Sequence, residues 1–250
     1  MIKVFLTVII MSLAACSSSD MKDPQKIIDR SIQSHGFDKL HGKAINFKFR
    51  KKFYSVRRYA DRYVYTSSFA NSTGAVEDRL VNSTELSRTV NGNQVTLTKK
   101  SEGIITEAIN SVLYFFQLPY GLNDAAVNKK YEGTTTIDGT TYYLVGITFG
   151  ENGGGKDFQD EYLYWVNTNT YLVDFLAYNY IVNEGGVRFR KAINRKTIDG
   201  LTFQDYINYK PVSKSTPLKS LGRLYEKGEL QELSRIVSEG ITVSDAVAPD

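Results

Sequence analysis

Residues 101–122 have the sequence SEGIITEAINSVLYFFQLPYGL, the most apolar part of the chain after the N-terminal leader. Apolar residues recur in it at helical spacing, at Ile104, Ile105, Ala108, Ile109, Val112, Leu113, Phe115 and Phe116. The helix is predicted to end at Leu118-Pro119, because a residue before proline is pushed out of the helical conformation. This helix interrupts a chain that otherwise alternates between polar and apolar residues.

Strands are predicted on both sides of the helix, where apolar residues recur with period two. Before the helix they are 44–53, 59–69, 76–82, 85–90 and 94–99, and after it 129–137, 141–149, 162–167, 171–182, 187–198, 201–209 and 230–236. Asn91-Gly92 between two of these segments is the strongest short signal for a hairpin, because both turn residues must adopt positive φ. Asp138-Gly139 and Asp199-Gly200 predict further turns.

Another helix is predicted just before the first strand. Asp23-Pro24 places an N-cap before a proline in the first helical position, and Gly36 is a natural end. Its apolar stripe consists of Ile27, Ile28, Ile32 and His35. Seventeen tyrosines and thirteen phenylalanines suit half-buried, pleated surfaces.

We therefore predict an α+β fold, mainly antiparallel β. Its centre is a strongly curved open sheet or half-barrel of about ten strands in a meander, with the N-terminal helix and the inserted apolar helix against the concave face. A β-sandwich would explain the strands equally well, but it would not explain the inserted helix.

The N-terminus predicts a signal peptide. Lys3 supplies positive charge, and residues 4–13 form an apolar run of signal-peptide length, shorter than the span of about 20 residues that crosses a bilayer. Leu13-Ala14-Ala15-Cys16 resembles the lipobox of bacterial lipoproteins, which implies cleavage before Cys16 and lipid on its thiol. The alternative is an ordinary signal peptide followed by a stray cysteine. Cys16 is the only cysteine, so no disulfide can form within the chain.

These features divide the chain into four parts: a signal peptide (1–15), a lipidated polar tether (16–23), a single β-rich domain (24–243) and a flexible tail (244–250). The length after the signal peptide suits one all-β domain. Ser17 after the cysteine resembles the sorting signal for the outer membrane. We expect a lipid-anchored protein there, facing the periplasm or the cell surface.

The charge of the chain is nearly balanced, with 31 basic and 27 acidic residues and a formal net charge of +4. This balance does not indicate nucleic acid as a partner. The one local basic excess consists of Lys48, Arg50, Lys51, Lys52, Arg57, Arg58 and Arg62. It could contact anionic head groups, but alternation with Phe47, Phe49 and Phe53 favours the solvated face of the first strands.

No catalytic or metal motif is found. His35 and His41 are the only histidines, no Gly-x-Ser-x-Gly elbow accompanies them, and we interpret them as cap or core residues. An acidic group follows three glycines at 153–155 and consists of Asp157, Asp160 and Glu161. It could offer oxygen ligands to calcium, although its spacing matches no calcium loop and a solvated loop is favoured. We expect no enzyme, no metal and no other cofactor.

A resemblance is carried by residues 138–145 (DGTTYYLV), 162–167 (YLYWVN), 185–190 (GGVRFR) and 198–201 (IDGL). Their order resembles an uncharacterised family of Gram-negative outer-membrane lipoproteins, and it is similar in layout to the Lol-type lipoprotein carriers and acceptors. The resemblance implies an incomplete barrel, lidded by helices, whose apolar cavity holds acyl chains. The predicted lipid anchor on Cys16 departs from a soluble carrier.

Two functions follow. The first is a noncatalytic, monomeric, membrane-anchored protein that binds or shuttles a lipid or lipidated cargo, with candidate ligand-lining residues Val112, Phe115, Phe116, Leu118, Tyr120, Leu122 and Trp165. The alternative is a surface recognition module that binds glycan or protein through exposed aromatic side chains. The same apolar residues could also simply fill the core, because an apolar helix over a sheet is how α+β domains are built.

Overall fold

The computed structural model describes residues 22–151, 159–181 and 185–247. Its helices are α1 (Pro24–Ser34), α2 (Lys99–Phe116) and α3 (Leu221–Glu226), with short 3-10 turns η2 (Phe37–Lys39), η3 (Tyr120–Asn123) and η4 (Leu218–Ser220). The strands form two seven-stranded sheets in which every pairing is antiparallel. The prediction of a mainly antiparallel β fold is confirmed.

Each sheet is a meander of consecutive strands. The first contains β1 (Lys43–Phe49), β2 (Lys52–Arg58), β3 (Tyr63–Asn71), β4 (Gly74–Val81), β5 (Glu85–Val90) and β6 (Asn93–Val95). The second contains β7 (Val127–Ile137), β8 (Thr140–Phe149), β9 (Tyr162–Asn167), β10 (Val173–Tyr180), β11 (Gly186–Ile198) and β12 (Leu201–Lys210). Helix α2 connects β6 to β7.

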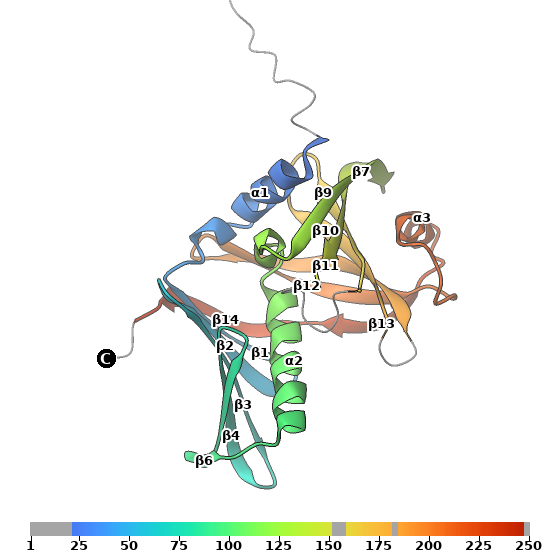
Figure 1. Ribbon diagram of the computed structural model, residues 1–250. Coiled ribbons are helices and arrows are strands. Elements are labelled where there is room, and N and C mark those ends of the chain that lie inside the picture. The colour runs from blue at the N-terminus through green and yellow to red at the C-terminus, as the bar shows by residue number, and fades with distance from the viewer. Residues whose placement is uncertain (1–21, 152–158, 182–184, 248–250) are drawn as a thin grey trace, which may run out of the picture.

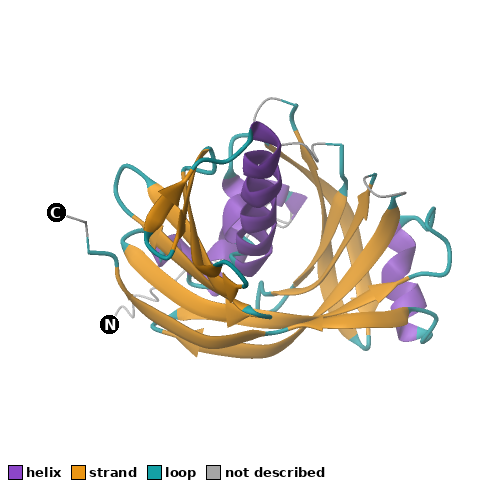
Figure 2. Cartoon of the chain, turned by 90° about the horizontal axis from the view of Figure 1, so that it is seen from below, coloured by secondary structure: helices purple, strands orange, loops and turns teal. Residues whose placement is uncertain are grey.

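The last two strands join the sheets. β13 (Gln231–Ile236) pairs with β12, and β14 (Ser238–Asp245) pairs with β1. Only Val237 separates them, so they run across the molecule almost as one strand (Figure 1). The sheets together make a curved surface, and α2 lies on its concave side (Figure 2). We call the side that faces α2 the inner face and the opposite side the outer face.

Helix α1 forms as expected. Asp23 is the N-cap, and its Oδ1 accepts a hydrogen bond from the Gln25 backbone N–H at 2.9 Å. The expected stripe of isoleucines is buried. Gly36 follows with a φ of 73°, and a Cβ at this position would collide with the carbonyl oxygen of Gly200. The end of α1 therefore lies close against the turn between β11 and β12.

Two sequence-based expectations fail in the first strands. The segment predicted as one strand, 44–53, is split by a turn at Arg50, whose φ is 56°. The turn shifts the alternation, so Phe53 lies on the outer face and is 62% exposed. Arg58, expected in the solvated basic group, shares the inner face of β2 with Tyr54 and Val56 and is only 9% exposed.

Other differences concern the C-terminal part. Strand β14 and helix α3 were not predicted, and pairing continues through Ser244 and Asp245, past the expected start of the tail. A six-residue helix is too short to show helical periodicity. The predicted signal peptide, Cys16 and Asp157 lie outside the described residues.

The buried residues form two clusters. The larger lies between the helices α1 and α2 and the inner face of both sheets, and the smaller lies between the outer face of the second sheet and α3. In β9, Tyr164 belongs to the inner cluster and its neighbours Leu163 and Trp165 to the outer one, because successive side chains of a strand point to opposite faces.

Candidate functional site

Helix α2 is the centre of the candidate site, because it covers the inner face. Its N-terminus is capped by Thr98, whose Oγ1 accepts the backbone N–H of Ser101 at 3.2 Å. Ile109 and Leu113, one helical turn apart, are fully buried against the sheets. Ile104, nearer the N-terminus of α2, is 59% exposed. The helix is thus packed most firmly toward its C-terminal end.

Phe116 fills the space between the two sheets. Its ring stacks on Phe47 of β1 with centroids 3.7 Å apart, and on Phe203 of β12 with centroids 5.1 Å apart. Both pairs are nearly parallel, with interplanar angles of 11° and 17°. The centre of the molecule, where β1 and β12 flank the joined last strand, is therefore packed with aromatic rings.

Six of the seven candidate ligand-lining residues come together in the inner cluster. Leu118 and Leu122 are fully buried, whereas the partly buried members are Val112, Phe115, Phe116 and Tyr120. The seventh, Trp165, is separated from them and lies in the outer cluster, where its ring meets Phe189 edge-on at 5.4 Å. The grouping of Trp165 with the α2 residues is thus corrected.

A second group of rings lies beside α2 on the second sheet. Phe115 approaches Tyr178 of β10 at 5.5 Å between centroids and Tyr162 of β9 at 6.4 Å. Tyr162 in turn lies 5.3 Å from Tyr178 and 5.6 Å from Phe149 of β8. We call these four residues the aromatic row. All four are only partly buried.

Phe149, Tyr162 and Tyr178 were not among the candidate site residues predicted from the sequence. A signal was available: in each strand, alternation puts these residues on the same face as residues of the inner cluster, such as Tyr164 and Leu176. It could not show that α2 would bring Phe115 to them, because that depends on how the helix lies across the sheet.

Two buried arginines contact α2 or the loop after it, one from each sheet. Arg58 donates from Nε and Nη2 to Oε1 of Gln117 at 3.1 and 2.7 Å, and its guanidinium lies 4.2 Å from the centre of the Tyr120 ring. Arg190 of β11 lies 3.9 Å from the centre of the Phe115 ring. The C-terminal part of α2 is thereby held between cations of both sheets.

Three buried hydroxyl groups lie where α2 meets the inner face, on Tyr114 of the helix, Tyr164 of β9 and Tyr206 of β12. Burial raises the pKa of Tyr114, Tyr164 and Tyr206 above the ordinary value for tyrosine. These phenols therefore stay neutral at physiological pH, and none is a ready general base.

His35 lies in the core, as interpreted from the sequence. Its Nδ1 donates to the carbonyl of Thr202 at 3.1 Å, and its Nε2 accepts the backbone N–H of Val173 at 3.3 Å. Burial lowers the pKa of His35 to about 4. The imidazole is therefore neutral and ties the end of α1 to β10 and β12. His41 is exposed.

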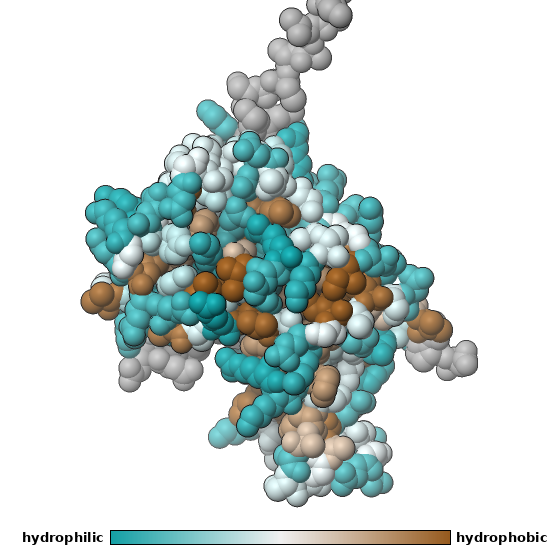
Figure 3. Space-filling view, turned by 180° about the vertical axis from the view of Figure 1, so that it is seen from behind, coloured by the Kyte–Doolittle hydropathy of each residue, from teal (hydrophilic) through white to brown (hydrophobic). Residues whose placement is uncertain are grey.

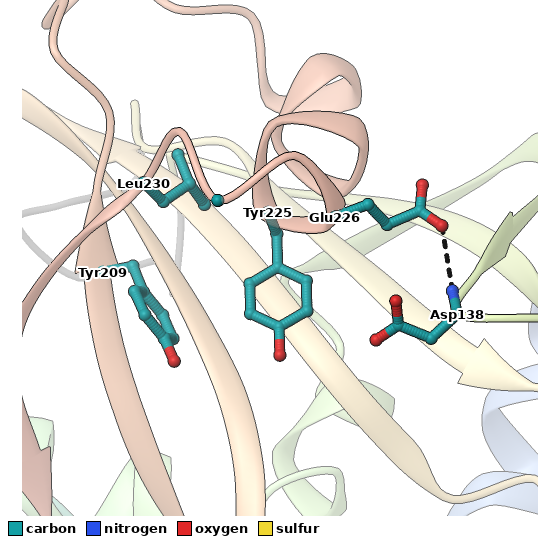
Figure 4. A pocket seen from close by; sticks show the side chains of 6 residues that line it. Asp138, Tyr209, Tyr225, Glu226 and Leu230 are labelled. Carbon is teal, nitrogen blue, oxygen red and sulfur yellow. Dashed lines mark hydrogen bonds between the residues drawn. The ribbon is translucent and has the colours of Figure 1, made fainter.

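A pocket of about 300 Å³ opens on the outer side, below α3 (Figure 4). Asp138, Tyr209, Tyr225, Glu226, Gly228 and Leu230 line it. The Tyr209 and Tyr225 rings meet edge-on at 5.6 Å, and Glu226 accepts the backbone N–H of Asp138 at 2.9 Å. The pocket thus combines two aromatic rings with two carboxylates.

Within residues 22–151, 159–181 and 185–247, no three side chains of His, Cys, Asp or Glu gather in a way that could hold a metal ion. In the same part of the chain, no helix is both long and apolar enough to cross a membrane.

Comparison with protein families gives one match, to a family of unknown function (DUF6503) over residues 2–238. The chain belongs to this family. The predicted membership of an uncharacterised family is confirmed at this level, whereas the lipid anchor stays a prediction. A comparison with curated proteins finds no match.

Solved structures offer similar chains at low sequence identity. A DUF1329 family protein from Desulfovibrio piger is 10% identical and has a TM-score of 0.51 over 77% of this chain and 88% of that one, so the two share a fold. A LolA superfamily protein from Nitrosomonas europaea is 13% identical, with a TM-score of 0.44 over 89% of this chain and 91% of its own. The Mycobacterium tuberculosis lipoprotein LppX is 14% identical, with a TM-score of 0.30 over 65% and 91%.

Proposed function

We propose that this protein is a noncatalytic lipoprotein of the bacterial cell envelope that binds an apolar ligand, a lipid or lipidated cargo, between α2 and the inner face of the second sheet. The observation that carries the proposal is the aromatic row. Three of its rings lie on the inner face of the second sheet and surround Phe115 of α2, yet all four remain only partly buried. Concave sites lined by aromatic side chains with few polar groups are typical of apolar ligands.

The packing of α2 supports a ligand beside it. Toward its C-terminus the helix is fixed by the Phe116 stack and by the bonds between Arg58 and Gln117. From this fixed part, Phe115 contacts Tyr162 and Tyr178, the members of the aromatic row on β9 and β10. An acyl chain lying on the row would bury more of these rings, and each square ångström of apolar surface removed from water contributes about 25 cal/mol.

The membrane anchor belongs to the same proposal. Lipid on Cys16 holds the protein to the outer membrane, on the periplasmic side or at the cell surface, since two or more acyl chains suffice for stable anchoring. Metabolic labelling with palmitate tests this part. Label is expected on the wild-type chain and absent from the Cys16→Ser variant; equal labelling of both rejects the anchor.

Native mass spectrometry combined with lipid extraction tests the binding. The chain from residue 16 onward, with Cys16→Ser, keeps every described element and can be purified without its membrane. The wild type is expected to retain a lipid. Phe115→Asp places a charge in the aromatic row and is expected to lose that lipid, whereas Phe53→Asp on the outer face is the matched control. A folded wild type without lipid, which also takes up none on titration, contradicts the proposal.

The second candidate is a recognition module that binds glycan on the outer side, and the pocket in Figure 4 favours it. Aromatic rings beside carboxylates, as at Tyr209, Tyr225 and Glu226, suit the apolar faces and hydroxyls of a sugar. On the face seen in Figure 3, apolar residues form several separate patches among hydrophilic ones. A glycan array probed with the wild type and with Tyr225→Ala tests this candidate. Glycan binding by the wild type that is lost in the variant supports it, and no glycan binding by the wild type rejects it.

A further inference from the structure

Arg190 is a buried cation on the inner face of the second sheet. It is 8% exposed, and its Nη2 donates to the hydroxyl of Tyr178 at 2.9 Å. Its Nε, by contrast, finds no hydrogen-bond acceptor among the described residues, and none of their carboxylates lies within ion-pair distance. A buried charge without a counter-charge is costly, so this position calls for a compensating anion.

A second polar atom without a partner lies directly across from it. Asn208 of β12 is paired with Arg190 in the strand register, so the two side chains share the inner face. Oδ1 of Asn208 is buried and accepts no hydrogen bond from any described residue, while its Nδ2 has only a long contact of 3.5 Å to Ser234. The pair therefore offers one donor and one acceptor at the same place.

The aromatic row ends at this polar pair. From β8 to β11, Phe149, Tyr162 and Tyr178 lead to Arg190, and Phe115 covers the guanidinium from α2. The order of the strands makes this a path across three strand spacings, about 14 Å in total. An apolar path that ends in a buried cation matches the shape of an amphiphile with a long tail and a charged head.

We propose, on the basis of the proposed function, that the ligand is an anionic amphiphile. Its anionic oxygen, from a carboxylate or a phosphate, accepts the Nε–H of Arg190. A hydroxyl or ammonium group of the head can donate to Oδ1 of Asn208, and the acyl chain lies along the aromatic row. Charge-assisted hydrogen bonds to a guanidinium are among the strongest in proteins. A triacylated cysteine carries no negative charge, so the site selects against that cargo.

Titration with two probes of equal chain length tests the proposal. Dodecanoate carries the anion and methyl dodecanoate lacks it. The full chain from residue 16 with Cys16→Ser is expected to prefer dodecanoate by about tenfold or more, since a factor of ten corresponds to 1.4 kcal/mol. Arg190→Met removes the charge and keeps a long apolar side chain, so it is expected to bind the two probes equally well.

Control variants separate this effect from general damage. Arg188→Met removes the neighbouring arginine of the same strand and is expected to keep the preference for dodecanoate. Arg190→Lys keeps the positive charge but lacks Nε, so it is expected to retain part of the preference for dodecanoate. Trp165 fluorescence confirms that each variant is folded. An unchanged preference in Arg190→Met overturns the inference.

The outcomes also separate this inference from the proposed function. If neither probe binds the wild type, both fail. If both probes bind the wild type with equal affinity, the apolar site stands and the anion site is rejected. Lysophosphatidylglycerol with a dodecanoyl chain, titrated in parallel, distinguishes a phosphate head from a carboxylate. If Arg190→Met binds either anionic probe more weakly than the wild type does, the anion site is supported. The probe that loses more affinity shows whether the site takes a carboxylate or a phosphate.

Discussion

The two sheets have the same number of strands and the same antiparallel meander, yet they differ in how many of their faces are covered. In β4 of the first sheet, buried residues alternate with exposed ones. In β9 and β10 of the second sheet, runs of consecutive residues are buried. The first sheet contributes only to the inner hydrophobic cluster, whereas the second contributes to both clusters, so the second sheet has an apolar core on each face.

Helix α3 accounts for the difference. It has only six residues, but Leu221 is fully buried and Gly222 lets the helix approach the sheet closely. A Cβ at Gly222 would lie 2.9 Å from Cδ1 of Ile137 and 3.3 Å from Nε1 of Trp165. A short helix at close range thus converts the outer face of the second sheet into a second core. The aromatic row lies against the opposite, inner face of the same sheet.

The largest effect is expected in this outer core. Phe189→Ala removes a fully buried ring that contacts Trp165, Phe175 and Tyr225, and it should lower the unfolding free energy by about 3–5 kcal/mol. Chemical denaturation followed by Trp165 fluorescence and circular dichroism measures this. A loss below about 1 kcal/mol would mean that the outer face is not a core, and the contrast between the sheets would disappear.

The next effect concerns the link between α1 and the second sheet. The pKa of His35 is lowered from 6.5 to about 4 in the folded chain, so the unfolded chain binds a proton at a higher pH than the native one. The contribution of neutral His35 to the unfolding free energy is therefore fully present above pH 6.5. As the pH decreases toward 4, the unfolding free energy falls by about 3 kcal/mol. Denaturation curves at several pH values measure this slope.

His35→Gln is the control for the pH effect, because it removes the titrating group and keeps hydrogen-bonding capacity. Its unfolding free energy should depend less on pH between 6.5 and 4 than that of the wild type. If the two dependences are the same, burial does not lower the pKa of His35 in the folded chain.

A smaller effect is expected inside the first sheet. Asp78 is 1% exposed, and its two oxygens accept Nε and Nη2 of Arg88 on β5 at 2.6 and 3.0 Å. Asp78→Asn should cost about 2 kcal/mol, less than a fully buried pair, because Arg88 is still partly hydrated. Glu232→Gln, in an exposed pair with Arg235, is the control and should change stability by less than about 1 kcal/mol.

The smallest effect is expected on the uncovered face of the first sheet. Phe53→Ala makes the same substitution as Phe189→Ala, but Phe53 is exposed on the outer face of the first sheet. The unfolding free energy should therefore change by about 0.5 kcal/mol or less. The two denaturation midpoints measure the contrast between the outer faces directly. A large loss at Phe53 would show that this face is covered in solution.

Local signals in the sequence predicted much of the chain. Asp23-Pro24 fixed the start of α1, and Asn91-Gly92 adopts the positive φ values of 50° and 80° that the hairpin needs. Each of these depends on a few neighbouring residues and on backbone sterics. The strand prediction failed at Arg50, because a positive φ at an arginine has no sequence signature comparable to Asn-Gly.

The candidate site was predicted only in part, because local patterns do not specify contacts between distant segments. Periodicity correctly put Phe115 and Phe116 on an apolar helix, but Trp165 was grouped with them and lies instead on the outer face of the second sheet. Alternation cannot tell which face is covered or by what. Arg58 and Arg190 were hidden in ordinary basic stretches, since the burial of a charge depends on neighbours that lie far away in the chain.

The sequence by itself determined the mainly antiparallel β class, the inserted apolar helix and most of the turns, because short-range sterics and hydrophobic periodicity act within a few residues. Only the tertiary structure decided that the last two strands, β13 and β14, join the two sheets, that α3 gives the second sheet an outer core, and that Arg190 and Asn208 meet beside the aromatic row. Those arrangements depend on contacts between distant segments, whose free energy comes from burial that no local pattern specifies.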